Sequence, residues 1–232
     1  MASARLWRRR VRIGGGIALT LALVAMTAWL FAINWTPDRT AFPVQGIDIS
    51  EAHEPVDWFE VRKTHQIQFV YVRASMGATG RDARFPMHWA GLQQAEMRRG
   101  AIHIFSLCQL AADQAGNLVG AIPPSPDALP VALDLAFQPG CAAHPEREVV
   151  LGEISRFITG VEGATGKPVI LRVSPEFERR YRVSRAIPRK LWSVAAFFPP
   201  AYFDKRWTMW QASSFRRFSG ISGPVNWNVM VK

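Results

Sequence analysis

The stretch LPVALDLAF, residues 129–137, reads as a short apolar strand that ends on one carboxylate, Asp134. An apolar run of this length, bounded here by proline-rich and glycine-containing turns, is typical of a strand buried in a parallel sheet. Such strands often carry a pair of acids at this end, yet the second position is Ala136. The methyl group in place of a second acid is the most informative feature of the chain.

On both sides of this stretch, strand patterns alternate with helix patterns. Further strand candidates are GIDIS (46–50), IQFVYVRAS (67–75), AIHIFS (101–106), KPVILRVS (167–174), KLWSVAAF (190–197) and WTMWQAS (207–213). Helical patterns cover 56–65, 86–100, 111–119 and 144–163, the second with Pro86 at its start, arginines in its last turn and Gly100 at its C-cap. Alternation of this kind predicts parallel βα units, and hence one α/β domain with a barrel-like sheet.

The formal charge of +10 in 232 residues comes partly from the N-terminus. Five arginines lie within the first 12 residues before any acid, and without them 23 Lys and Arg face 18 Asp and Glu. The remaining excess of five is modest, spread along the chain and without a recognisable binding motif. The charge therefore gives no support to a nucleic-acid partner.

An uncharged apolar segment, IGGGIALTLALVAMTAWLFAINW (13–35), follows the arginines. It is long enough to cross a hydrocarbon core, which takes roughly 20 helical residues. A cleavable signal peptide is the alternative, but its apolar region is shorter and ends in a small-x-small site, whereas this run closes on Trp29, Phe31 and Trp35. A buried core helix is a further alternative for this segment, but core helices seldom lack a polar face over such a length. We expect a cytoplasmic basic tail (1–12), a transmembrane signal-anchor (13–35), a linker (36–43) and an exported domain (44–232).

Two cysteines, Cys108 and Cys141, fall in the exported part, where thiols can oxidise. They follow two strands that could be neighbours, so a disulfide is a candidate and two free thiols are the alternative. Two cysteines without a nearby cluster of His or acids do not supply the four ligands of structural zinc, so we expect no metal. We expect no cofactor either.

In a β/α barrel the chemistry sits at the C-terminal ends of the strands. The polar and charged residues expected there are Asp48, Arg73, Ser75, His103, Asp134, Ser174, Gln211 and Asn226. Asp48 and Asp134 could form half of an acid site, or could be structural carboxylates that accept hydrogen bonds. His103 lies between Ile102 and Ile104, and a satisfied core histidine is an equally good interpretation.

The motifs occur in a familiar order. GIDIS (46–50) with VDW (56–58), YVRASMG (71–77), HWAG (88–91), RRGAIHIF (98–105), LPVALDLAF, KPVIL (167–171), LW (191–192), and WQAS with GISGPVNWNVM at the C-terminus together resemble glycoside hydrolase family 25. This family contains lysozymes that cleave the N-acetylmuramyl bond of peptidoglycan. The resemblance covers about 44–231 and implies an irregular, TIM-like β/α barrel.

The resemblance carries over two catalytic acids and lacks two others. The family's first aspartate matches Asp48, and the aspartate of its central Asp-x-Glu matches Asp134. The glutamate taken as general acid is replaced by Ala136, and a C-terminal aspartate is replaced by Asn226. Two of the usual four acids are therefore gone, so the chain is a divergent member by this comparison.

Other groove positions also depart from the family pattern. Its Lys-Ala-Thr-Glu-Gly is Arg73 to Gly77 here, the tyrosine before the strand histidine is Ile102, and Trp-Gln-Tyr ends on Ala212. The histidines after the first Asp-x-Ser are replaced by Glu51 and Ala52. The motifs typical of the family's scaffold are kept, whereas several residues at the substrate groove are replaced.

Two functional hypotheses follow, and they differ in class. In the first, a pseudoenzyme anchored in a bacterial inner membrane, with its domain in the periplasm, binds peptidoglycan or another cell-wall glycan without hydrolysing it. In the second, an active N-acetylmuramidase uses a relocated acid, with Glu51 or Glu54 as candidates. The resemblance implies Asp48 and Asp134 as the retained catalytic acids, and the residues expected to contact substrate are His103, Arg73, Trp210 and Gln211. The oligomeric state is not predicted.

Overall fold

The computed structural model describes residues 2–54, 56–217 and 219–231 of the chain. The chain divides into two compact units, Met1–Trp35 and Thr36–Lys232.

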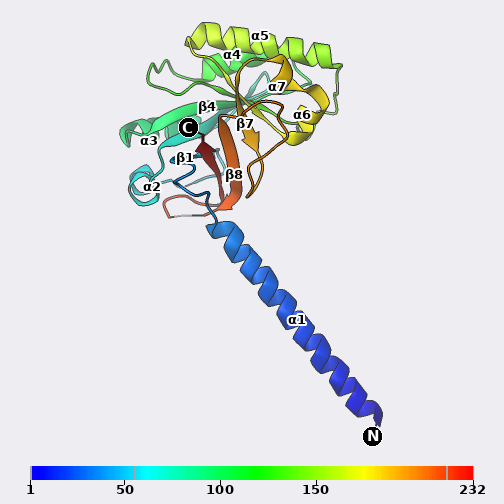
Figure 1. Ribbon diagram of the computed structural model, residues 1–232. Helices are drawn as coiled ribbons and strands as arrows, with labels where there is room; N and C mark the ends of the chain where they lie inside the picture. Colours follow the sequence, from blue (N-terminus) through cyan, green and yellow to red (C-terminus); the bar gives the residue numbers. More distant parts are fainter. Residues whose placement is uncertain (1, 55, 218, 232) are drawn as a thin grey trace. The chain divides into compact units, whose positions relative to one another are not determined.

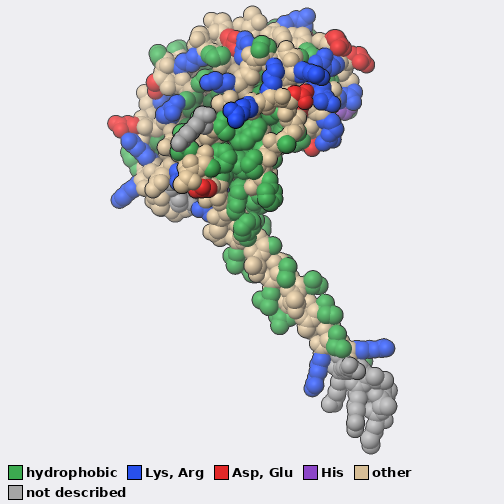
Figure 2. Space-filling model, viewed as in Figure 1, with side chains coloured by type: hydrophobic (Ala, Val, Ile, Leu, Met, Phe, Trp, Pro, Cys, Tyr) green, Lys and Arg blue, Asp and Glu red, His purple; other side chains and the backbone are tan. Residues whose placement is uncertain are grey.

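The first unit is a single helix, α1 (Ala2–Asn34), and its portion Arg10–Asn34 is long and apolar enough to cross a membrane. Figure 2 shows hydrophobic side chains along the helix and basic side chains near its N-terminal end. The helix begins well before the predicted span of 13–35, so part of the basic tail is helical. Thr20 and Thr27 donate their hydroxyls to the carbonyls of Gly16 and Leu23, which satisfies these polar groups within an apolar helix.

The second unit is a closed barrel. Eight strands form the ring in the order β1-β2-β4-β5-β6-β7-β8-β9, and β9 pairs back with β1 (Figure 1). Their bounds are β1 Val44–Ile49, β2 Phe69–Met76, β4 Arg98–Ile104, β5 Ala132–Leu135, β6 Ile170–Val173, β7 Lys190–Val194, β8 Met209–Arg216 and β9 Val225–Met230. The short β3 (Gly80–Arg81) forms a hairpin with β2. The predicted barrel of α/β class is confirmed.

The barrel is irregular, as the family resemblance implied. The strands from β1 to β8 pair in parallel around the ring, whereas β9 is antiparallel to both of its neighbours. Because β9 runs in the opposite direction, its first residues lie at the same rim as the last residues of β1 and β8. Asn226 therefore reaches the rim from the start of a strand and not from its end.

Helices follow most of the parallel strands. Their bounds are α2 Trp58–His65, α3 Phe85–Gln94, α4 Ala111–Ala121, α5 Arg147–Thr165, α6 Pro175–Tyr181 and α7 Val183–Ala186. Asp57 caps α2 by accepting a hydrogen bond from the Glu60 amide, and Ser174 caps α6 in the same way through Phe177. α4 and α5 lie together on one side of the barrel (Figure 1).

The sequence pattern predicts a helix over 86–100, and its extension to Gly100 is wrong. α3 ends at Gln94, Glu96 has a positive φ of 51°, and Arg98 already belongs to β4. Gly100 serves the strand, because a Cβ at this position would lie 2.4 Å from the ring of Tyr71. The glycine that looked like a helix cap makes room for an aromatic ring inside the barrel.

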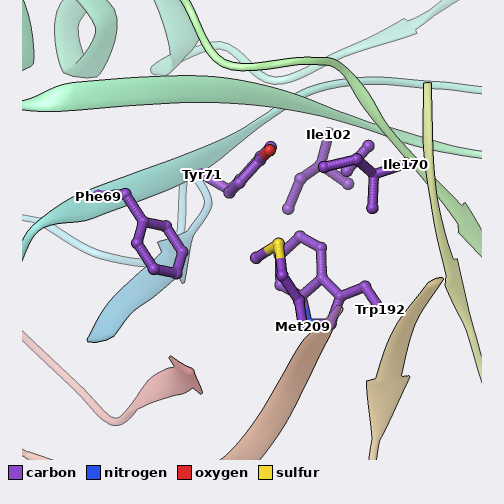
Figure 3. Close-up of a cluster of buried hydrophobic side chains, with 7 residues drawn as sticks. Phe69, Tyr71, Ile102, Ile170, Trp192 and Met209 are labelled. Atoms are coloured by element: carbon purple, nitrogen blue, oxygen red, sulfur yellow. The ribbon is translucent and has the colours of Figure 1, made fainter. Parts of the chain in front are cut away.

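The barrel interior is layered. The layer further from the mouth is apolar, and Figure 3 shows large side chains from several strands converging in it. This cluster comprises Phe69, Tyr71, Ile102, Ala132, Ile170, Trp192 and Met209. Successive side chains of a strand alternate between the two faces, so the next inward residues along the same strands form the layer above, at the mouth.

Cys108 and Cys141 form a disulfide, with their Cα atoms 5.8 Å apart. Cys108 follows β4 and Cys141 follows β5, and these strands are neighbours in the ring. The structure has the bond between the two candidate cysteines, and this cross-link joins two loops at the barrel mouth.

Gly46 offers a test of barrel closure. A Cβ at Gly46 would lie 2.4 Å from the carbonyl oxygen of Phe69, a backbone atom of the paired strand β2. We expect Gly46→Ala to lower the free energy of unfolding by about 2–3 kcal/mol, because this contact forces the two strands apart. Chemical denaturation measures the change.

Gly152→Ala is the matched control. Gly152 lies within α5, and a Cβ there would meet nothing within 4 Å. We expect this change to leave stability unaltered or to raise it by up to about 1 kcal/mol, as alanine does in a helix. Equal effects of the two substitutions would contradict the closure argument.

Candidate active site

A cavity of about 160 Å³ opens at the barrel mouth, above the apolar layer. Its lining includes both acids predicted from the sequence, Asp48 and Asp134, together with Asn226. The C-terminal ends of parallel strands and the start of antiparallel β9 meet here, which is where barrel folds place their chemistry. The structure therefore brings Asp48, Asp134 and Asn226 together at one cavity.

Asp48 is held by two asparagines of the facing strand. Asn226 Nδ2 donates to its Oδ2 at 2.7 Å, and Asn228 Nδ2 donates to its Oδ1 at 2.8 Å. Asp48 and Asn226 are direct partners in the antiparallel pair β1–β9, so the register places these side chains opposite each other. The carboxylate is 7% exposed, and the two amide donors compensate for its burial.

Asp134 forms an ion pair with Arg172 across neighbouring strands. The two residues are register partners on β5 and β6, and Arg172 Nη1 lies 2.5 Å from Asp134 Oδ2. Burial raises the pKa of Asp134 above its usual value and the nearby charge of Asp48 adds to the rise, whereas Arg172 opposes it. Burial disfavours the charged guanidinium, but Asp134 and Asp48 outweigh it and raise the pKa of Arg172.

Arg172 also links the two acids through a chain of side chains. It donates through Nη2 to Gln211 Oε1, and Gln211 Nε2 donates to Asn226 Oδ1 at 3.2 Å. Since Asn226 in turn donates to Asp48, one hydrogen-bonded chain crosses the mouth from β5 to β1. Gln211, predicted from the sequence as a substrate-contacting residue, is a member of this chain of hydrogen bonds.

The sequence interpretation missed Arg172. The stretch KPVILRVS is predicted as an apolar strand, and Arg172 within it is not among the predicted site residues. A charged residue between Leu171 and Val173, both fully buried, is itself a signal, because an ionised side chain inside a barrel needs a partner. Arg172 is therefore an additional member of the site.

Arg73 lines the cavity, and two of its donor nitrogens are occupied. Its Nε lies 3.0 Å from Asp82 Oδ2 and its Nη2 lies 2.9 Å from Glu51 Oε1. Glu51, one candidate for a relocated acid, thus forms an ion pair at the rim. Glu54, the other candidate, pairs with Arg84 at 2.9 Å.

His103 and Trp210 lie outside the barrel interior and do not line the cavity. His103 is fully buried between Ser75, Gln114 and the ring of Phe157, which lies 4.8 Å away. Trp210 is 1% exposed and donates its indole N–H to the Ala195 carbonyl at 2.7 Å. The expectation that these two side chains contact substrate does not fit their positions, and the alternative of a core histidine fits His103.

Ala136 follows β5, two residues beyond Asp134. Its side chain has neither a proton to give nor a charge. Among the described residues that line the cavity, the carboxylates are Asp48 and Asp134, and both already accept hydrogen bonds. The arrangement can hold polar groups, and it lacks a carboxyl group at the position expected for the acid.

A closed β/α barrel with two acids at its mouth is an architecture that many barrel enzymes share. Comparison with known proteins makes the class specific, because the sequence model of "Glycosyl hydrolases family 25" matches residues 47–221. The chain therefore belongs to glycosyl hydrolase family 25, and the resemblance predicted from its motifs is confirmed.

Solved structures agree with this assignment. A family 25 glycosyl hydrolase from Bacillus anthracis has a TM-score of 0.76 at 27% identity, over 84% of this chain and 91% of that one. A bacterial lysozyme from Streptomyces coelicolor has a TM-score of 0.72 at 24% identity, over 81% of this chain and 91% of that one. The second likeness, at this identity, shows the fold alone.

Curated proteins are similar at the same level of identity. Lysozyme M1 of Streptomyces globisporus is 27% identical over 198 residues, which cover 80% of this chain and 67% of that protein. An uncharacterised Escherichia coli K12 protein, YegX, is 28% identical over 197 residues, which cover 82% of this chain and 70% of that protein.

The position of His103 predicts a pH dependence of stability. Burial lowers the pKa of His103 from 6.5 to about 4, with a hydrogen bond to Gln114 opposing the shift. The unfolded chain then binds more protons than the folded one between pH 6.5 and 4, so this residue contributes stability above pH 6.5 that is lost as the pH falls to 4. Its share of the slope is up to about 1.4 kcal/mol per pH unit.

His103→Gln isolates this contribution, because glutamine keeps polar atoms near Ser75 and Gln114 and does not titrate. We expect the variant to be less stable than the native protein at pH 7 and to lose less stability between pH 6.5 and 4. Urea denaturation at several pH values measures both slopes. Parallel curves would show that His103 does not titrate as its burial implies.

Proposed function

We propose that this chain is a membrane-anchored, lysozyme-like domain that binds cell-wall glycan with hydrolysis lost or strongly reduced. The observation that carries the proposal is the state of the groove acids. Asp48 and Asp134 are both engaged by donors, and Ala136 stands where the family resemblance places the general acid.

The physical argument concerns the leaving group. Glycosidases protonate the departing glycosidic oxygen with a carboxylic acid while a second group supports the opposite face of the sugar. A positioned general acid typically contributes about 10²–10⁴-fold to the rate. Alanine at 136 contributes nothing to this step, and the amide of Asn226 carries no charge to stabilise a cationic transition state.

The glycan partner is supported by the family and by the polar cavity that remains. The chain is similar to a protein named Lysozyme M1, and lysozymes act on peptidoglycan. Hydrogen-bonding groups persist at the mouth, including Gln211, Asn226 and His53, the last held by the Pro224 carbonyl at 2.9 Å. A groove can retain affinity for a glycan after its acid is lost, because binding and proton transfer use different groups.

The first test compares binding with cleavage. We expect the detergent-solubilised full chain to co-sediment with insoluble peptidoglycan and to be displaced by soluble glycan fragments. Reducing ends should not rise above the level of a protein-free control, while an active lysozyme of the family releases them under the same conditions.

Two results would contradict the proposal. Release of reducing ends by the native protein, abolished by Asp134→Asn, would favour the alternative of an active N-acetylmuramidase with a relocated acid. Failure to co-sediment would exclude the glycan partner.

We further propose that α1 anchors the protein in a bacterial inner membrane, with its N-terminus in the cytoplasm and the barrel in the periplasm. The arginines before the apolar segment favour this orientation by the positive-inside rule. The Cys108–Cys141 disulfide supports an oxidising compartment for the barrel.

A fusion tests the orientation. Alkaline phosphatase, which is active outside the cytoplasm, is joined after Lys232, and we expect an active, membrane-bound fusion of full length. Replacing Arg8, Arg9, Arg10 and Arg12 by serine should lower its activity, because the charge bias that sets orientation is weakened. A soluble fusion shortened by the length of the N-terminal segment would instead indicate a cleaved signal peptide.

A further inference from the structure

The groove floor is formed by the hydrogen-bonded side chains at the barrel mouth, Asp48, Asp134, Arg172, Gln211 and Asn226. Among the described residues that line the cavity, Arg172 is the one cation that contacts two of the other members. Its guanidinium contacts Asp134 and Gln211 and lies 5.4 Å from the centre of the Trp192 ring. Only 13% of its side chain is exposed, so the charge is committed to these partners. Its position in β6, opposite Asp134 in β5, is fixed by the strand register.

We propose that Arg172 is a positioning residue that locks the groove floor in a non-hydrolytic arrangement. Hydrolysis would then return when Arg172 is replaced together with Ala136 and Asn226, and would not return when the two acids alone are restored. This inference rests on the proposed loss of hydrolysis.

The first reason is electrostatic. Glycoside cleavage passes through an oxocarbenium-like, positively charged transition state. A fixed guanidinium beside Asp134 places a positive charge in the layer where that charge develops, and it occupies one of the carboxylate oxygens. The low polarity of a buried site strengthens such repulsion.

The second reason concerns a restored acid at position 136. Ala136 is the first residue after β5, and continuing the alternation of the strand by one residue would place a glutamate at 136 just above Asp134, within the span of a long arginine. An arginine beside a carboxyl group favours its ionised form. The restored glutamate would then be an anion at neutral pH and would have no proton to give.

The reaction itself makes this requirement explicit. The acid transfers its proton to the glycosidic oxygen as the bond to the anomeric carbon breaks. Water then adds to that carbon, and the proton it loses returns the carboxylate to its acid form. Each turnover needs a protonated carboxyl group at the start, and a neighbouring guanidinium opposes that state.

The experiment compares restored variants in the full chain. The double variant carries Ala136→Glu and Asn226→Asp, and the triple variants add Arg172→Gln, Arg172→Met or Arg172→Lys. Gln and Met remove the charge, and having both keeps the test valid if one of them does not fold, whereas Lys keeps the charge without the planar fork. Thermal unfolding confirms that each protein is folded.

A further variant controls for the loss of an arginine–carboxylate ion pair as such, at a partly exposed site away from the cavity. Arg189→Gln, added to the double variant, removes an arginine whose Nε lies 2.7 Å from Glu162 Oε1, and neither residue lines the cavity. Its effect on reducing-end release from peptidoglycan is expected to be nil. Carboxylate NMR of the native background supplies a second readout, since Arg172→Gln should raise the pKa of Asp134 relative to the unsubstituted protein.

We expect the Gln and Met triple variants to release reducing ends at least about tenfold faster than the double variant, within the range that a positioned acid supplies. The Lys triple variant should match the double variant. The proposed role of Arg172 would be contradicted if the double variant released reducing ends as fast as the triple variants, or if the Arg172→Lys triple variant were as fast as the Arg172→Gln triple variant. Either result would leave the proposed function intact. Cleavage by the native protein would overturn both.

Discussion

Closure of the ring is the constraint on which the rest of the structure depends. Because β9 pairs with both β1 and β8, the eight ring strands have two neighbours each, and the register of the entire barrel is fixed. A fixed register decides which side chains face inward. The groove floor is therefore the top layer of the barrel interior, built on the apolar layer that includes Tyr71 and Trp192.

That dependence makes polar satisfaction at the mouth a property of the whole barrel. Asp48 receives its donors from β9, and Asp134 receives its donor from β6. Asn228 also accepts a hydrogen bond from the indole of Trp192 at 3.2 Å, which ties the apolar layer to the polar one. Removing one partner of such a network leaves a buried polar group unsatisfied, which typically costs about 1–3 kcal/mol.

Most of the fold could be predicted from the sequence, because strand and helix patterns are local and strongly periodic. Seven of the eight ring strands and the neighbouring cysteines followed from the pattern, and the family resemblance implied the irregular barrel. The antiparallel strand β9, which closes the ring, was not among the predicted strands. The errors came from reading positions one at a time. His103 lies between two isoleucines, of which Ile102 belongs to the barrel interior, so alternation sends the histidine outward. Met209 and Gln211 place Trp210 on the outer face by the same rule.

The replacement of acids also has a structural logic. Asn226 donates to Asp48 at 2.7 Å, so an aspartate at 226 would bring a second carboxylate within hydrogen-bonding distance of the first. Two carboxylates at that distance cannot both be ionised without strong repulsion, and one must hold a proton. Asparagine removes this repulsion and supplies a donor, and Arg172 does the same for Asp134.

Asn226 and Arg172 thus favour a stable, hydrogen-bonded interior, in line with the general conflict between active-site chemistry and stability. In the native protein, Asn226 and Asn228 donate hydrogen bonds to Asp48, and Arg172 donates to Asp134. Under the proposed loss of hydrolysis, a return of activity would need acids to be added and a donor to be removed, because the present donors stabilise the charge states that catalysis must change.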